Sequence, residues 1–193
     1  MILAGVDEVG RGPLAGPVIA AAVVLPDRYE LDGLTDSKKL TPGRREALSD
    51  LIRQQAVAWA IGRCEVEEID RINILQASLL AMKRAVESLA IEPDVSLIDG
   101  IFAPVMKCRT KTIVKGDLSE PSISAASIVA KVARDREMCL LHKTYPEYEF
   151  DRNKGYPTSR HLAALRRHGI CKEHRRSFSP VRQLIAQKEF TLE

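Results

Sequence analysis

Two adjacent acids near the start of the chain are the residues best placed to do chemistry. Asp7 and Glu8 follow a short apolar run, residues 2–6, and precede a segment rich in Gly and Pro, residues 10–17. A short apolar run bounded by such turn residues is typical of a buried strand. We therefore expect both carboxylates at a strand end, beside a loop whose glycines let the backbone approach a ligand closely. The alternative is a turn-capping Asp next to an exposed Glu.

Two further acids have settings that could bring them to the same place. Asp99 follows a second short apolar run, residues 95–98, and is itself followed by a glycine. Asp135 lies in an expected helix, residues 122–142, whose Ala and Ser content lets a backbone lie close to a sheet. The alternatives are Asp99 as a turn residue and Asp135 as the ion-pair partner of Lys131, one helical turn earlier. The candidate cluster of catalytic and metal-ligating acids is Asp7, Glu8, Asp99 and Asp135.

Carboxylates gathered in this way favour hard metal ions. Close carboxylates raise one another's pKa, so the cluster is stable when cations lie among them. Oxygen ligands select Mg²⁺ or Mn²⁺ over zinc. Two such ions, about 3.5 to 4 Å apart, activate water on one side of a phosphodiester and stabilise the departing oxygen on the other. The pattern therefore predicts a site for two Mg²⁺ or Mn²⁺ ions.

The rest of the chain alternates between strand and helix patterns. Thr41 followed by Pro42 is a helix start, and Gly169 is a helix stop. Alternating elements predict an α/β fold with a mixed sheet. We expect strands at residues 18–25, 57–64, 95–98 and 112–115, and helices at residues 42–55, 65–91, 122–142 and 159–168.

Composition restricts the class of protein. A chain of 193 residues, 45% hydrophobic and 28% charged, fits one globular domain, residues 1–193, and excludes a disordered or fibrous chain. We expect no membrane span and no secretion signal, and hence a cytoplasmic protein. The four cysteines form no Cys-x-x-Cys pair, so neither a zinc knuckle nor a disulfide framework is expected.

The charge is unevenly distributed along the chain. The formal net charge is +3, but the chain from Asp151 onward carries ten Lys or Arg and four Asp or Glu, whereas the first 150 residues carry 19 and 22. A basic segment on a mildly acidic body is what contact with a phosphate backbone requires, and the alternative is a solvated helix. Eight of these ten lie between residues 152 and 176 and form the basic segment: Arg152, Lys154, Arg160, Arg166, Arg167, Lys172, Arg175 and Arg176.

Several motifs, in order, resemble those of one enzyme family. Residues 7–18 read DEVGRGPLAGPV, which resembles the N-terminal signature of the type 2 ribonucleases H, the ribonuclease HII family. The likeness extends from about residue 3 to about residue 182. The later motifs are DSKKL at 36–40, INIL at 72–75, IDG at 98–100, GD at 116–117, SISAASIVAKVARD at 122–135, KGYPT at 154–158 and HRRSF at 174–178.

The resemblance implies a fold and an activity. The fold is ribonuclease H-like: a mixed five-stranded sheet flanked by helices, about residues 1–145, with a basic helical C-terminal segment, about residues 146–193. The activity is endonucleolytic hydrolysis of RNA in RNA–DNA hybrids, including incision 5′ of a single ribonucleotide in duplex DNA. The products carry 5′-phosphate and 3′-hydroxyl ends, and the biological role is removal of misincorporated ribonucleotides and RNA primers. The implied protein is a monomer without an organic cofactor or a membrane partner.

The resemblance also implies roles for individual residues. It matches Asp7, Glu8, Asp99 and Asp135 to the family's metal-site acids. It matches Gly10, Arg11 and Gly12 to the loop that contacts the 2′-hydroxyl and adjacent phosphates, and Tyr156 to a tyrosine that packs at the RNA–DNA junction. A 2′-hydroxyl alone separates RNA from DNA at one nucleotide, so its reader must lie close to it. Further candidates for phosphate contact are Ser37, Lys38, Arg166 and Arg167.

Three other functions compete with this interpretation. Ribonuclease HIII carries an extra N-terminal substrate-binding domain, for which we expect no room because the first acid-bearing strand starts at residue 2. A catalytically silent hybrid-binding module would have lost one of the acids. A metal-dependent DNA nuclease or resolvase on the same fold would cleave duplex without ribonucleotides, and a cleavage assay separates it from a ribonuclease H.

Overall fold

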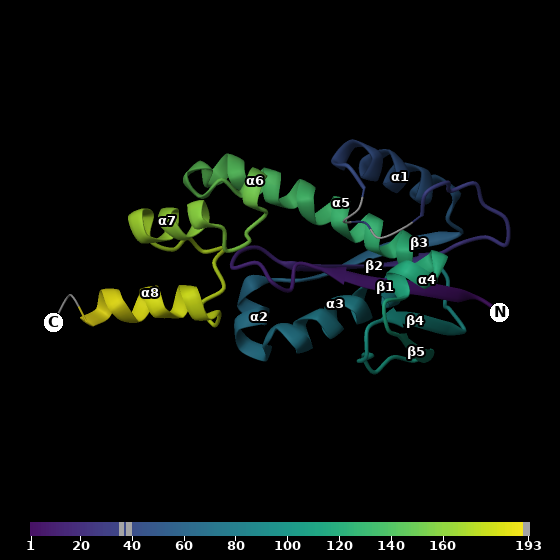
Figure 1. The fold of residues 1–193 in the computed structure, drawn as a ribbon. Coiled ribbons are helices and arrows are strands. Elements are labelled where there is room, and N and C mark those ends of the chain that lie inside the picture. The colour runs from purple at the N-terminus through teal and green to yellow at the C-terminus, as the bar shows by residue number, and fades with distance from the viewer. Residues whose placement is uncertain (35–36, 38–39, 191–193) are drawn as a thin grey trace.

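The computed structural model describes residues 1–34, 37 and 40–190, with side chains described as far as residue 187. Its centre is a five-stranded sheet in the order β3-β2-β1-β4-β5 (Figure 1). β1 pairs antiparallel with β2 and parallel with β4, so the sheet is mixed, as expected. The strands are β1 (Leu3–Val9), β2 (Val18–Val24), β3 (Ala58–Cys64), β4 (Val95–Asp99) and β5 (Arg109–Ile113).

Helices cover both faces of this sheet. The helices beside it are α1 (Pro42–Gln55), α2 (Val66–Ile72), α3 (Ile74–Glu87), the short α4 (Gly116–Ser119) and α5 (Pro121–Thr144). The C-terminal segment is helical, as expected: η1 (Pro146–Tyr148), α6 (Phe150–Asn153), α7 (Ser159–His168) and α8 (Ser179–Phe190). α7 and α8 lie beyond the end of β1, away from the edge strand β5 (Figure 1).

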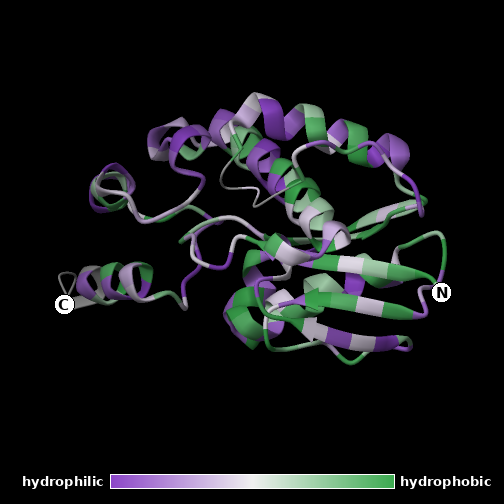
Figure 2. Ribbon diagram, turned by 45° about the vertical axis from the view of Figure 1, so that its right-hand side comes forward, coloured by the Kyte–Doolittle hydropathy of each residue, from purple (hydrophilic) through white to green (hydrophobic). Residues whose placement is uncertain are grey.

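Strand alternation divides the core into two layers. Residues 18, 20 and 22 of β2 pack with α2 and α3, whereas residues 21 and 23 pack with α1 and α5. β2 is therefore buried on both faces, and the central strands are hydrophobic along most of their length (Figure 2). In β1 the same alternation directs Val6 toward the α3 layer and Asp7 toward the α5 layer.

The close approach of α5 to the sheet depends on small residues. A Cβ atom at Gly5 of β1 would lie 2.1 Å from the carbonyl carbon of Ser122, so only glycine fits there. The helix buries Ala125, Ala126 and Ala130 against the strands. The expectation that this Ala- and Ser-rich helix lies close to the sheet is confirmed.

Three expected boundaries were wrong. β1 continues to Val9, so Asp7 and Glu8 lie inside the strand rather than after it. The single helix expected at 65–91 is two helices, because Asn73 has a positive φ of 68° and caps the second through its side chain. The strand expected at 112–115 is β5, Arg109–Ile113. Among the described residues, no helix combines the length and apolar character that crossing a membrane requires.

Candidate active site

Three of the four expected acids line one cavity at the carboxyl ends of β1 and β4. The cavity has a volume of about 420 Å³. Asp7 and Glu8 enter it from β1, and Asp99 enters it from the last position of β4. Because β1 and β4 are parallel neighbours, their carboxyl ends lie at the same edge of the sheet. The remaining lining residues are Val9, Gly10, Arg11, Gly12, Ser37, Asp117, Ser127, Lys131 and Tyr156.

Asp7 is the most deeply buried acid of the cavity, with 7% of its surface exposed. Its Oδ1 atom accepts a hydrogen bond of 2.7 Å from the backbone N–H of Glu8. Burial, and then the charges of Glu8 and Asp99, raise the pKa of Asp7 well above its usual value. Burial also raises the pKa of Glu8, opposed by the guanidinium of Arg11, which lies 3.4 Å from the Glu8 carboxylate.

Asp99 organises the turn that brings a further acid to the cavity. Its Oδ1 atom accepts a hydrogen bond of 2.7 Å from the backbone N–H of Gly116, the first residue of α4. Asp117 follows directly and lines the same cavity. The sequence analysis did not select Asp117 as a site acid. The available signal was the Gly116-Asp117 pair directly after the strand expected at 112–115, which resembles the Asp99-Gly100 pair after the preceding strand.

The structure does not bring Asp135 to the other three acids. Ser127 and Lys131 of α5 line the acid cavity, but Asp135 lines a separate cavity of about 780 Å³. The reason is helix geometry: eight residues beyond Ser127 correspond to about 12 Å along the axis. Asp135 instead accepts from Lys131 at 2.6 Å, the ion pair considered as the alternative, and lies 3.5 Å from Arg45.

The donor chemistry of the cavity fits hard divalent cations. Asp7, Glu8, Asp99 and Asp117 all supply carboxylate oxygens. The Oδ1 atoms of Asp7 and Asp99 each accept a backbone N–H, which fixes these two carboxylates at the cavity. The Ser127 side chain forms a further hydrogen bond with Asp7. Within the described part of the chain, no three Asp, Glu, His or Cys side chains form a closed ligand cluster. The acids therefore share the walls of a cavity, where burial, and then repulsion from Glu8 and Asp99, raise the pKa of Asp7.

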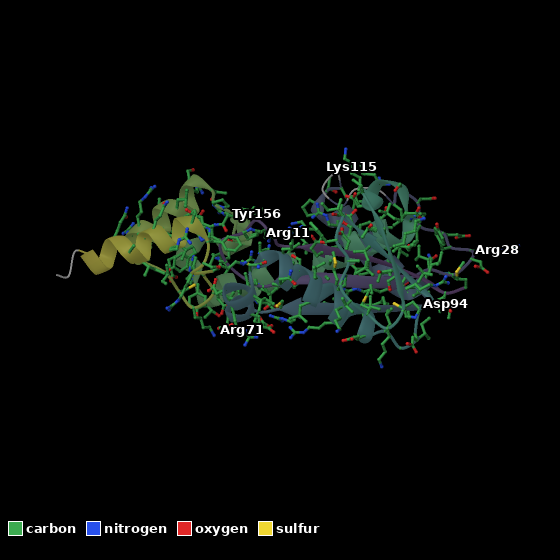
Figure 3. All side chains as sticks on the ribbon, turned by 90° about the horizontal axis from the view of Figure 1, so that it is seen from below. Arg11, Arg28, Arg71, Asp94, Lys115 and Tyr156 are labelled. Atoms are coloured by element: carbon green, nitrogen blue, oxygen red, sulfur yellow. The ribbon has the colours of Figure 1, made fainter. Side chains whose placement is uncertain are left out.

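The glycine loop between β1 and β2 forms another wall of this cavity. Gly10 has a φ of 97°, a conformation that side-chain-bearing residues rarely adopt. Gly12 faces Tyr156: a Cβ atom at position 12 would lie 3.4 Å from the Cε1 atom of the tyrosine ring. Tyr156 is 40% exposed, and Figure 3 shows it beside Arg11 where the C-terminal segment meets the sheet. The loop and Tyr156 therefore lie together, as expected.

The expected phosphate-contact residues have different positions. Ser37 is buried, lines the acid cavity and lies 3.0 Å from Ser127, hydroxyl to hydroxyl. Its carbonyl accepts a 2.6 Å hydrogen bond from Arg45. Lys38 lies outside the described residues. Arg166 and Arg167 are exposed on α7 and do not line the cavity.

The basic C-terminal segment is not all surface. Arg175, expected among its phosphate contacts, is fully buried with 0% exposure. Its guanidinium donates hydrogen bonds to carbonyls of the glycine loop, so it cannot also meet a phosphate. Charge counting missed this because burial depends on the tertiary contact between the segment and the loop.

The chain is similar to known proteins both in sequence and in fold. The chain is 58% identical over 185 residues to a ribonuclease HII from Delftia acidovorans, covering 96% of this chain and 79% of that protein. The crystal structure of the ribonuclease H2 from Pyrococcus horikoshii OT3 superimposes with a TM-score of 0.81 at 28% identity, over 98% and 99% of the two chains. Bst-RNase HIII, crystallised with Mn²⁺, has a TM-score of 0.75 at 18% identity over 98% of this chain and 71% of that one, a likeness of fold alone.

The family assignment rests on nearly the whole chain. The sequence model of the family described as Ribonuclease HII matches residues 4–181. That range includes both acid-bearing strands, the glycine loop, α4 and Tyr156. The chain is therefore an enzyme of the ribonuclease H type and belongs to the ribonuclease HII family.

Proposed function

We propose that this ribonuclease H, which acts on RNA–DNA substrates, also incises duplex DNA on the 5′ side of a single embedded ribonucleotide. Cleavage would leave 5′-phosphate and 3′-hydroxyl ends, and the cellular role would be removal of misincorporated ribonucleotides and RNA primers. The observation that carries the proposal is that the acids, the glycine loop and Tyr156 line one cavity. Chemistry and sugar recognition can thus act on the same nucleotide step.

The acids of the cavity would hold the metal ions. We assign this role to Asp7, Glu8, Asp99 and Asp117, which share the cavity and supply only carboxylate oxygens. Two Mg²⁺ or Mn²⁺ ions bound there would activate the attacking water and stabilise the departing 3′-oxygen. Asp7 and Asp99 contribute orientation as well, because a backbone N–H fixes one oxygen of each. Asp135, paired with Lys131 and Arg45, would act outside the ligand set.

The glycine loop and Tyr156 would recognise the ribonucleotide. Backbone groups at Gly10, Arg11 and Gly12 can approach a 2′-hydroxyl where side chains would clash. The ring of Tyr156 offers a stacking face next to Gly12, with its hydroxyl at the edge. Arg11 connects the loop with the acids, because its guanidinium contacts Glu8 and is half exposed.

The phosphates on either side would be held less specifically. We assign contact with an adjacent phosphate to Ser37, which lines the cavity, and to Lys38, which follows it in the sequence. Arg166 and Arg167 are exposed on α7 beyond the cavity, where they could meet the duplex several nucleotides away. Such contacts add affinity without sugar or sequence information.

A cleavage assay with matched substrates tests the proposal. Labelled duplexes of one sequence would carry no ribonucleotide, one ribonucleotide, or a full RNA strand, each with Mg²⁺, Mn²⁺ or a chelator. We expect metal-dependent cleavage of the hybrid and incision 5′ of the single ribonucleotide, and intact all-DNA duplex. Cleavage of the all-DNA duplex would indicate a DNA nuclease. Binding without cleavage under every metal condition would indicate a silent hybrid-binding module.

A further inference from the structure

Two buried arginines donate hydrogen bonds to the carbonyls of the glycine loop. Arg134 lies on α5, and Arg175 lies in the connection between α7 and α8. Both side chains have 0% exposure and are the largest fully buried side chains among the described residues. Arginine is rarely buried completely unless its donors are satisfied, so the partners of these two guanidiniums indicate what they do.

Arg175 binds carbonyls along the loop from Gly10 to Gly16. Its Nη2 atom donates to the carbonyl of Gly10 at 2.6 Å, and its Nη1 atom donates to the carbonyl of Arg11 at 3.1 Å. Nε and Nη2 both donate to the carbonyl of Gly16, at 3.0 and 2.8 Å. Its backbone N–H donates to the carbonyl of Leu14 at 2.8 Å. The C-terminal segment therefore fixes a loop more than 150 residues earlier in the chain.

Arg134 binds the second half of the loop and the segment that carries Tyr156. It donates from Nη2 to the carbonyl of Ala15 at 3.1 Å, and from Nε to the carbonyl of Pro17 at 3.1 Å. Its Nη1 atom donates to the carbonyl of Lys154 at 3.0 Å, two residues before Tyr156. One guanidinium thus ties the loop and the Tyr156 segment to the same helix.

Burying two guanidinium charges without carboxylate partners costs free energy of folding, so a purely structural role does not explain the arrangement. Every side-chain hydrogen bond described for the two guanidiniums goes to a neutral carbonyl rather than to a carboxylate. Burial lowers the pKa of Arg134 to about 10 and that of Arg175 to about 9, so both remain charged at neutral pH. Well-packed apolar side chains often stabilise a core better than buried charges do. Orienting the loop for a ligand is a function that apolar packing would not supply.

The hydrogen bonds from Arg175 to the loop carbonyls determine the direction in which the loop N–H groups point. No peptide bond of the described chain is cis, and in a trans peptide the C=O and the following N–H point in opposite directions. The carbonyls of Gly10 and Arg11 point toward Arg175. The N–H groups of Arg11 and Gly12 must therefore point away from Arg175, at positions that line the acid cavity.

We propose that Arg134 and Arg175 are positioning residues for sugar recognition: by binding the loop carbonyls from behind, they present the N–H groups of Arg11 and Gly12 to the ribonucleotide. This inference rests on the proposed function, because it assumes that the loop meets the nucleotide. Two adjacent N–H groups backed by buried positive charge suit a 2′-hydroxyl oxygen or the neighbouring phosphate oxygen. Neither arginine is a catalytic residue, since both side chains are fully buried beneath the loop and donate to its carbonyls.

Arg→Lys variants with matched controls test the positioning role. Lysine keeps the charge but lacks the planar fork that reaches several carbonyls. Exposed arginines outside the basic segment provide controls, Arg28 for Arg175 and Arg136 for Arg134. We expect Arg175→Lys and Arg134→Lys to lower kcat/KM on single-ribonucleotide duplex by about a hundredfold, the scale of a misplaced binding group. Arg28→Lys and Arg136→Lys should remain within about threefold of the wild type.

Binding separates positioning from general damage to the fold. With chelator present, the wild type should bind a duplex with one ribonucleotide more tightly than the same duplex in all-DNA form. The two buried-arginine variants should lose that preference while keeping the all-DNA affinity and the Mg²⁺ concentration for half-maximal activity. Folded variants that keep the preference would overturn the inference. A wild type without any preference would instead remove the proposed function on which the inference rests.

Amide hydrogen exchange on the wild type tests the peptide orientation even if a variant fails to fold. The N–H groups of Leu14 and Gly16 donate to Gly155 and Glu173 carbonyls and should exchange slowly with and without substrate. Those of Arg11 and Gly12 should exchange rapidly in the free protein and slowly once ribonucleotide duplex is bound in chelator. Slow exchange of both in the free protein, or no change on binding, would contradict the inference.

Discussion

The Oδ1 atom of Asp99 accepts a hydrogen bond of 2.7 Å from the backbone N–H of Gly116, which joins the end of β4 to the turn that carries Asp117. A Cβ atom at position 116 would lie 2.5 Å from the Cδ1 atom of Ile123, so the turn packs tightly against α5. Asp99 therefore has two effects: it lines the acid cavity, and it holds the next acid in place.

Substitution of the acids should separate ligands from bystanders. Asp7→Asn, Asp99→Asn or Asp117→Asn should lower cleavage about a thousandfold or more, because each removes a charge from the metal site. Asp135→Asn should keep cleavage within about tenfold of the wild type, since Asp135 pairs with Lys131 outside the cavity. Initial rates at saturating Mg²⁺ decide. Near wild-type cleavage by Asp117→Asn, with severe loss in Asp135→Asn, would restore the assignment made from the sequence.

The sequence predicted what depends on local or repeating patterns. The start of α1 follows from Thr41 and Pro42, and the start of α7 from the Thr158 hydroxyl, which accepts from His161 N–H. The short apolar run followed by Gly and Pro correctly predicted that Asp7 and Glu8 lie near the carboxyl end of a strand, although β1 runs two residues past Asp7. Such features require only neighbours in the chain.

What the sequence did not predict depends on contacts between distant segments. Asp117 reaches the cavity because β5 is parallel to β4, and strand order is not a local property. Asp135 misses it because α5 carries it two turns beyond Ser127. Arg175 belongs to a charged run typical of a surface, yet its guanidinium lies under a loop more than 150 residues away in the chain.

The buried Asp7 should make metal-free stability depend on pH. Burial and the neighbouring acids raise its pKa, so the folded protein holds the proton more tightly than the unfolded chain. From about pH 4, near the ordinary Asp pKa, up to the raised pKa, the free energy of unfolding should therefore fall as pH rises. In chelator, Asp7→Asn should lose this fall and exceed the wild type in stability at neutral pH. Denaturant titrations at a series of pH values measure it, and parallel curves for the two proteins would contradict the expectation.

Two buried histidines, His161 and His174, are hydrogen-bonded to each other and form a relay. We expect this relay to make the free energy of unfolding rise with pH, opposite to the effect of Asp7. Cys171 N–H donates to His174 Nδ1 at 3.0 Å, so the His174 proton is on Nε2, 3.0 Å from His161 Nε2. His161 is then protonated on Nδ1, 2.9 Å from the carbonyl of Tyr156. Both rings are neutral in this arrangement, because a second proton on either would place two N–H groups face to face.

Acid should therefore destabilise the segment that carries Tyr156. Burial, and then His161, lower the pKa of His174 from 6.5 to about 4. The relay contributes up to about 3 kcal/mol to the free energy of unfolding. This contribution is complete above about pH 6.5 and is lost as the pH falls toward about 4. His174→Gln should flatten this acid limb, whereas His168→Gln, at an exposed position of α7, should not. The comparison uses unfolding free energies with Asp7 unchanged, so the opposing Asp7 effect cancels between variants.

The exposed arginines of α7 should contribute affinity without selectivity. Arg166→Ala with Arg167→Ala should weaken binding to hybrid and to plain duplex alike, and lower the slope of log affinity against log salt by about 2 if both contact phosphates. Arg28→Ala is the control, since Arg28 is exposed at the opposite end of the molecule (Figure 3). An unchanged salt slope in the double variant would mean that α7 faces solvent in the complex.

Tyr156 should matter most where only one ribonucleotide is present. If its ring positions the nucleotide step beside Gly12, Tyr156→Ala should lose about ten- to a hundredfold at a lone ribonucleotide, the scale of one stacking contact of about 1 to 3 kcal/mol. The loss should be smaller within a long RNA strand, where neighbouring ribonucleotides offer other registers.

Tyr156→Phe provides the matched control for Tyr156→Ala. Phenylalanine keeps the stacking face and removes only the hydroxyl, so its activity should lie between those of alanine and the wild type. All-DNA affinity should hardly change in either variant, because the ring is expected to act at the junction rather than along the phosphate backbone. If Tyr156→Ala lost equal activity on the single-ribonucleotide duplex and on the long hybrid, with metal affinity intact, Tyr156 would have only a structural role. Selectivity would then rest on the glycine loop, whose amide groups are oriented by Arg134 and Arg175 rather than by the tyrosine.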